Sequence, residues 1–281
     1  MSVKIIIDST ADLMPAVKAR CLVVPLTIHF DDEEYIDGVT ISHKEFYEKL
    51  VETDVMPRTS QANPDAFAKE FEKVSAAGDS AVVIVISSKL SGTCQSAMIA
   101  AADYDNIYVV DSGTGAIGAG ILTEYALQLA DEGLDAKSIA QKLDEEKKRI
   151  KIVAMVDTLE YLYKGGRLSK TAAIAGGILN IKPVLAIDDG EIKILGKARG
   201  SKQGNNFLVS EIEKAGGVDF ERPVLLGYTG LSNALLVKYI EDSKALWEQG
   251  TQELHSTIIG SVIGTHAGPG AVAAAFFRKQ S

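Results

Sequence analysis

A run of six consecutive apolar residues at positions 81–86 (AVVIVI) constrains the fold more than any other feature of this sequence. A continuous apolar run of strand length is typical of a strand buried on both faces, as in a parallel sheet covered by helices. Strand-like runs at 4–7 and 107–110 also end abruptly in polar residues. Helical patterns are found at 64–77, 93–102 and 114–132. Strands that alternate with helices of this length predict parallel βαβ units.

The pattern changes after about residue 150. Two strand-like segments, 184–187 and 192–195, predict a hairpin turned by Asp189-Gly190. Further strands are expected at 152–156 and 224–228, and helices at 159–164, 171–181, 202–215 and 232–249. We therefore predict a two-domain α/β fold: an N-terminal parallel βαβ-sheet domain at 1–150 and a C-terminal mixed-sheet α/β domain at 151–281.

Composition and charge exclude several classes of partner. The net charge of -9 argues against non-specific binding to nucleic acid or to an anionic membrane, which requires a basic surface. No apolar run reaches the roughly 18 residues of a membrane-spanning helix, so no stable membrane insertion is expected. The first residues lack a signal-peptide layout, and the two cysteines are typical of reduced thiols. These features predict a cytoplasmic protein, and the spacing of its cysteines and histidines supports no metal site.

Two loops carry more hydroxyl groups than a helix start requires. The segment 58–64 (RTSQANP) offers Thr59 and Ser60, although Asn63 alone could cap the following helix. The segment 87–93 (SSKLSGT) joins the most apolar strand to a helix and contains Ser91. Free N–H groups at a helix start favour anions, and ligands of parallel sheets bind beyond the carboxyl ends of the strands. The two loops therefore predict a site for a small anion.

Three further segments supply candidates with weaker support. His266 lies in a glycine-rich stretch, 264–270, whose glycines could simply form a tight turn. A lone histidine is more often structural than functional. Arg167 follows two glycines and could meet an anion, but a single arginine is more often a surface residue or an ion-pair partner. Ser112 follows the strand-like run at 107–110.

The sequence contains no familiar catalytic or nucleotide-binding motif. Neither a Walker sequence nor a dinucleotide-binding glycine fingerprint is present, and no nucleophile elbow appears. We therefore assign no catalytic residue and no cofactor. Asp8, at a strand end, resembles a phosphotransferase nucleophile, but Thr10 stands where a second carboxylate would be needed. A small-molecule phosphotransferase or hydrolase using Asp8 or Asp111 remains the alternative.

Six motifs follow one another along the chain: DSTADL at 8–13, TSQ at 59–61, SSKLSGT at 87–93 with QSA at 95–97, VDS at 110–112, GRL at 166–168 and HAGPG at 266–270. Together they resemble the DegV family of bacterial fatty-acid-binding proteins, and the resemblance covers nearly the whole chain. One departure is Ala62-Asn63 between Gln61 and Pro64, where the family commonly has proline directly after glutamine.

The resemblance implies a fatty acid buried within or between two α/β domains. It also implies that hydroxyls matching Thr59 and Ser91 hold the carboxylate, and we add Ser60, Ser112 and His266 as candidate fatty-acid-binding residues. Arg167 is a candidate for contact with the head group or with a partner. Proteins of this family resemble the acyl-carrying partner of a fatty acid kinase, whose separate subunit binds ATP and makes acyl phosphate. A lipid sensor that delivers nothing is a third possibility.

Overall fold

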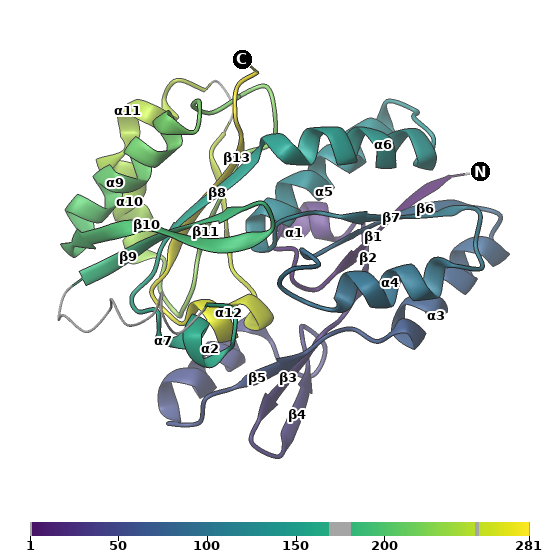
Figure 1. The fold of residues 1–281 in the computed structure, drawn as a ribbon, viewed down its shortest axis with the longest axis horizontal. Coiled ribbons are helices and arrows are strands. Elements are labelled where there is room, and N and C mark those ends of the chain that lie inside the picture. Colours follow the sequence, from purple (N-terminus) through teal and green to yellow (C-terminus); the bar gives the residue numbers. More distant parts are fainter. Residues whose placement is uncertain (1, 169–180, 251–252, 281) are drawn as a thin grey trace.

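The first sheet of the computed structural model is wholly parallel. The structure describes residues 2–168, 181–250 and 253–280. The strand order of this parallel sheet is β2-β1-β6-β7, so β1 has a neighbour on each side (Figure 1). The strands expected at 4–7, 81–86 and 107–110 are confirmed as three of its members. Its strands are β1 Val3–Asp8, β2 Leu22–Val24, β6 Ser80–Val85 and β7 Ile107–Asp111.

The second sheet is mixed and has the order β10-β9-β8-β13-β11-β12. Only β11 and β12 pair in parallel, and the other neighbours are antiparallel. The predicted hairpin is confirmed, with Asp189 and Gly190 at its turn. The strands are β8 Ile150–Met155, β9 Ile181–Asp188, β10 Glu191–Arg199, β11 Leu225–Tyr228, β12 His255–Ile258 and β13 Val272–Phe277.

A small antiparallel sheet with the order β4-β3-β5 was not predicted from the sequence. Its members are β3 Thr27–Phe30, β4 Glu33–Ile36 and β5 Arg58–Ser60. Thr59 therefore lies in a short strand, opposite Ile28, and not in the loop that we expected. A three-residue strand of Arg, Thr and Ser has no apolar alternation by which it could be recognised.

Helices cover the sheets, and the cap expected at Asn63 is present. Asn63 accepts a hydrogen bond from the Ala66 N–H (2.9 Å) and so caps α3, with Pro64 in the first turn. Ser42 and Glu45 form a capping box at the start of α2. The helices are α1 Pro15–Lys18, α2 His43–Glu52, α3 Pro64–Ala76, α4 Thr93–Ala101, α5 Ala116–Asp131, α6 Ala136–Glu146, α7 Glu160–Lys164, α9 Gly200–Lys214, α10 Ala234–Asp242, α11 Lys244–Trp247 and α12 Ser261–Ala267, with a 3₁₀ turn at Lys147–Arg149.

Two expected elements differ in the structure, and one cannot be compared. The helix expected at 232–249 is two helices, α10 and α11, which meet at Ser243. The Ser243 hydroxyl donates to the carbonyl of Tyr239 and accepts from Trp247 Nε1 (2.8 Å). The first four residues of the glycine-rich stretch, 264–267, do not form a tight turn. They belong to α12, and Gly264 lies inside this helix. The helix expected at 171–181 lies almost entirely outside the described residues.

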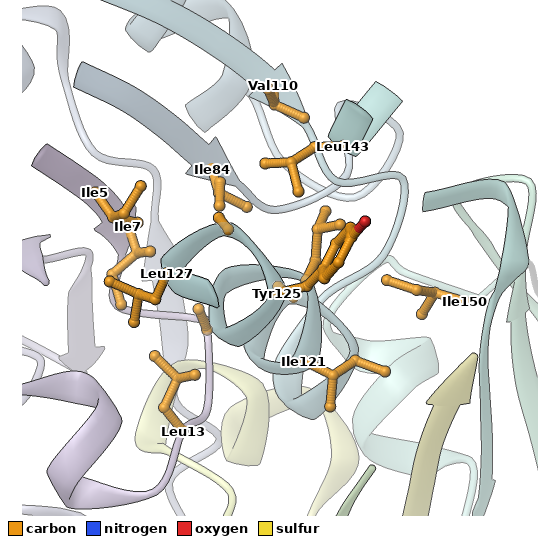
Figure 2. Packing of buried hydrophobic residues seen from close by; sticks show 14 of the residues in the cluster. Ile5, Ile7, Leu13, Ile84, Val110, Ile121, Tyr125, Leu127, Leu143 and Ile150 are labelled. Carbon is orange, nitrogen blue, oxygen red and sulfur yellow. The ribbon is translucent and has the colours of Figure 1, made fainter. Parts of the chain in front are cut away.

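Helix α5 lies between the two larger sheets and joins their cores. It contacts β1 and β6 of the parallel sheet and β8, β11 and β13 of the mixed sheet. Figure 2 shows its Ile121, Tyr125 and Leu127 among side chains from the neighbouring elements. The α/β fold with one parallel and one mixed sheet is confirmed. The parallel sheet comes entirely from strands before residue 150 and the mixed sheet from strands at or after it. The division into domains at 150 stays a prediction.

Candidate functional site: a cavity with one polar end

A cavity of about 410 Å³ lies where the parallel-sheet loops, the small sheet, α12 and the mixed sheet meet. Its volume falls within the range of small-molecule sites, roughly 300–1,000 Å³. The lining is mainly aliphatic, with polar groups contributed by few segments. The polar lining residues are Thr59, Ser60, Gln61, Ser91, Arg167 and His266. The apolar lining includes Leu26, Ile86, Leu90, Ile152, Ala154, Val156, Leu162, Leu185, Ile187, Ile192, Ile259, Val262, Ile263 and Ala273.

The mixed sheet forms an aliphatic floor to this cavity. Ala154 of β8 pairs with Ala273 of β13 on one side and with Leu185 of β9 on the other. One row further along, Ile152 pairs with Ile187. Side chains two residues apart on a strand share a face, which is why both rows line the cavity. The Ala154–Ala273 pair places two of the smallest apolar side chains side by side and leaves space above them.

The polar end is centred on a hydrogen bond between Thr59 Oγ1 and His266 Nε2 (3.0 Å). Strand β5 carries Thr59, and the last turn of α12 carries His266. Burial, assisted by the nearby charge of Arg167, lowers the pKa of His266 to about 4. The imidazole is therefore neutral at pH 7.

The surroundings of His266 favour one tautomer. Its Nδ1 is buried and has no hydrogen-bond partner within the described part of the chain. A Cβ at Gly165 would lie 2.2 Å from this Nδ1, so the ring packs directly on the glycine. A proton on Nε2 avoids burying an unpaired N–H donor at Nδ1. In that tautomer Nε2–H donates to Thr59, whose own hydroxyl proton is then free to point into the cavity.

The two hydroxyl-rich segments, 58–64 and 87–93, both contribute residues to this end of the cavity. Ser91 Oγ lies 2.9 Å from Thr93 Oγ1 and accepts from the Thr93 N–H (3.3 Å). Gln61 Nε2 donates to Ser96 Oγ (2.9 Å), which ties the β5 segment to α4. A Cβ at Gly92 would lie 2.0 Å from Gln61 Oε1, so the Gln61 side chain packs directly against this glycine. Because Asn63 caps α3, neither Thr59 nor Gln61 is required for capping.

Arg167 brings a positive charge to the polar end. Its Nη1 donates to the Gly165 carbonyl (2.7 Å) and its Nε to the Leu90 carbonyl (3.1 Å). Burial lowers the pKa of this guanidinium. Among residues 2–168, 181–250 and 253–280, no carboxylate forms an ion pair with it. A half-buried cation without a paired carboxylate favours an anionic ligand nearby.

Five of the six candidate residues line the cavity, and Ser112 does not. Ser60 lines it while its hydroxyl interacts with His29 Nε2 (2.9 Å). Ser112 donates to the Thr114 carbonyl (3.1 Å) and lines a separate polar pocket of about 350 Å³. Gln61 and the aliphatic floor were missed as site components. The TSQ motif at 59–61 contained Gln61, but no local pattern distinguishes the floor from ordinary strands.

The carboxylates of the alternative enzyme hypothesis lie outside the cavity. Asp8 is fully buried and accepts from the N–H and hydroxyl of Thr10 and from the Ile86 N–H. Asp111 accepts from the Gly113 N–H (2.9 Å) and lines the separate polar pocket. Both therefore hold loops at the strand ends. In the described residues, no group of three His, Cys, Asp or Glu side chains is arranged to hold a metal, and no helix is long and apolar enough to cross a membrane.

Comparison with known proteins places this chain in one family. Residues 2–279 match the model of the DegV family, which is described as uncharacterised proteins. A DegV domain-containing protein of Caldanaerobacter subterraneus subsp. tengcongensis is 41% identical over 261 residues, covering 92% of this chain and 91% of the relative. A DegV domain-containing protein of Halalkalibacterium halodurans is 33% identical, with 98% of each chain covered. The chain belongs to the DegV family.

Solved structures of similar proteins have the same fold. A fatty-acid-binding DegV family protein of Thermus thermophilus superposes with a TM-score of 0.88 at 28% identity, covering 99% of this chain and all of the other. A stearic-acid-binding protein of Eubacterium ventriosum gives 0.87 at 28% identity, with 99% of each chain covered. DegV of Bacillus subtilis, a fatty acid binding protein, gives 0.84 at 28% identity, with 99% and 100% covered.

Proposed function

We propose that this chain binds one long-chain fatty acid in this cavity, with the acyl chain on the aliphatic floor and the carboxylate at Thr59 and Ser91. The observation that carries the proposal is that one cavity combines a mainly aliphatic lining with a cluster of polar side chains around the Thr59–His266 hydrogen bond. The polar end combines two hydroxyl side chains, a neutral imidazole and the half-buried cation of Arg167. Fatty-acid binding by similar DegV proteins supports the same conclusion.

The energetics of such a complex are favourable. Burying an acyl chain gains about 0.8 kcal/mol per methylene, so about 14 methylenes contribute roughly 11 kcal/mol before the costs of association. A carboxylate loses several kcal/mol on leaving water unless hydrogen bonds replace its hydration. Thr59 and Ser91 supply two donors, and Arg167 adds a positive charge that no carboxylate of the described residues pairs with. Ser60 and His266 complete the polar wall, the latter by orienting Thr59.

Native mass spectrometry of the purified protein tests this function. We expect about one long-chain fatty acid per chain, released on denaturation and identified in the extract. Delipidated protein should take up added palmitate or oleate with the same stoichiometry. Protein that carries no lipid and takes up neither acid would contradict the proposal.

We further propose that the chain presents its fatty acid, in the cytoplasm, to a separate kinase subunit that binds ATP. The chain itself then needs no metal or cofactor and performs no chemistry. Asp8 and Asp111 support this role because both are engaged in loop hydrogen bonds outside the cavity. Acyl phosphate should form only when the kinase subunit and ATP are both added. ATP turnover by this chain alone would favour the phosphotransferase alternative, and binding without transfer would favour a sensor.

A further inference from the structure

Asp12 connects two walls of the cavity without lining it. It follows β1, and its side chain is buried, with 4% of the residue exposed. The backbone N–H of Asp12 donates to the carbonyl of Ala116, the first residue of α5 (3.2 Å). Its Oδ1 accepts from the N–H of Gly260, the residue immediately before α12 (2.7 Å). One residue thus contacts the starts of α5 and α12, two of the helices that reach the cavity.

The contact with α5 holds a strained part of the cavity wall. Ala116 lines the cavity and has a φ of 49°, in the left-handed region that residues with a side chain rarely adopt. Ala11 forms an isolated parallel bridge to Ala116, beside the hydrogen bond from Asp12. A Cβ at Gly120 would lie 2.0 Å from the Asp12 carbonyl oxygen, so the loop packs closely on the helix. The surrounding structure must therefore maintain this conformation.

The contact with Gly260 fixes the start of the helix that carries His266. The preceding residue is held as well, because the Tyr47 hydroxyl donates to the Ile259 carbonyl (2.9 Å). A Cβ at Gly264 would lie 2.5 Å from the same hydroxyl, so α12 also packs tightly on α2. Helix α12 has only two turns, and a shift at its start is therefore transmitted directly to His266.

We propose that Asp12 is a positioning residue for the head-group end of the cavity. Its hydrogen bonds to Ala116 and Gly260 fix the position of the start of α12 relative to the start of α5. This keeps His266 where it can orient the Thr59 hydroxyl. This inference rests on the proposed fatty-acid function and names a residue outside the binding surface that sets its geometry.

The surroundings of Asp12 give this role a pH dependence. Asp12 Oδ2 is buried and has no hydrogen-bond partner among the described residues. Burial, opposed mainly by the Gly260 hydrogen bond, raises the pKa of Asp12 to about 8, so the carboxyl is mostly neutral at pH 7. Above this pH a buried negative charge appears, and affinity for a second carboxylate in the cavity should fall. The titratable groups around the cluster are Asp8, Lys18, Asp37, His43 and Tyr47.

Three variants test the role through palmitate binding to delipidated protein. Asp12→Ala leaves the Gly260 N–H unpaired, and we expect affinity at pH 7 to weaken about 5- to 30-fold. Asp12→Asn keeps an oxygen acceptor, so it should bind within about threefold of the wild type and lose the fall in affinity above pH 8. Asp135→Ala is the matched control, because it also removes a carboxylate that accepts a backbone N–H, at the start of α6. It should leave binding unchanged.

The outcomes separate this inference from the proposed function. Unchanged affinity in a folded Asp12→Ala protein would overturn the inference alone. If that variant does not fold, Asp12→Asn decides, because an alkaline loss of affinity equal to that of the wild type would show that Asp12 is not responsible. A wild type that binds no palmitate would overturn the proposed function and this inference with it.

Discussion

The two ends of the cavity are built in opposite ways. The polar end gathers side chains from four separate segments, with Thr59 on β5, Ser91 before α4, Arg167 after α7 and His266 on α12. The floor is one continuous surface, formed by neighbouring strands of the mixed sheet. A polar site assembled from several segments depends on each of their contacts, whereas an aliphatic floor depends mainly on the volume of its side chains. The two regions should therefore respond differently to substitution.

The largest effect is expected from filling the floor. Ala154→Phe would occupy space above the Ala154–Ala273 pair and displace about four methylenes of a bound chain. At about 0.8 kcal/mol each, palmitate binding should weaken by about 3 kcal/mol, or about 150-fold. Decanoate, whose chain is shorter, should lose less. Titration calorimetry measures both, and Ala245→Phe on the exposed surface of α11 is the control for adding a phenyl ring. Equal losses for the two acids would place the acyl chain elsewhere.

At the polar end, Ser91→Ala and Thr59→Val each remove one donor to the carboxylate. A hydrogen bond to a charged group contributes about 1.5–3 kcal/mol, so each variant should bind palmitate about 10- to 150-fold more weakly. Their effects should be less than additive in the double variant, because both donors serve one carboxylate. Ser88→Ala, in the same loop but outside the cavity, is the matched control. Wild-type affinity in both single variants would contradict the head-group assignment.

His266 connects the polar end to protein stability. Its pKa is about 4 in the folded protein, below the usual 6.5. Between these two pH values the His266 imidazole therefore binds a proton in the unfolded chain and stays neutral in the folded chain. Stability is therefore lost as pH falls, and His266 should contribute about 2 kcal/mol to the loss between about pH 7 and about pH 5. Urea unfolding of the wild type and His266→Gln at both pH values measures this difference. His255→Gln, an exposed histidine on β12, should behave like the wild type.

The smallest effect is expected at Ser112, the one candidate that the cavity does not include. Its hydroxyl bonds to Thr114 within its own loop, so Ser112→Ala should cost about 1 kcal/mol of stability and change palmitate affinity by less than about twofold. Thermal unfolding and titration together check both values. A tenfold loss of affinity with unchanged stability would extend the head-group site beyond the cavity.

The difference between the two regions also explains what the sequence could predict. Loops after parallel strands meet at one edge of a sheet, so the position of Ser91 after β6 could be expected. Thr59 was indicated only by its hydroxyl-rich segment and by the resemblance, because it lies in β5 of the small antiparallel sheet. The floor could not be expected, because Ala154 and Ala273 become neighbours only through the pairing of β8 with β13, which are distant in the chain. In the sequence Gly264 resembled part of a turn. In the structure a glycine is needed there because the Tyr47 hydroxyl, from a distant part of the chain, packs closely against it. Local patterns contain no information on either contact.

Comparison of a fatty acid with its methyl ester tests the central claim most directly. Both ligands carry the same acyl chain and use the same aliphatic floor, but only the acid offers a charged head group to Thr59, Ser91 and Arg167. We expect wild-type protein to bind palmitic acid at least about tenfold more tightly than methyl palmitate, and this preference to shrink in Ser91→Ala. Equal affinity of the wild type for acid and ester would show that the carboxylate is not held at this end of the cavity.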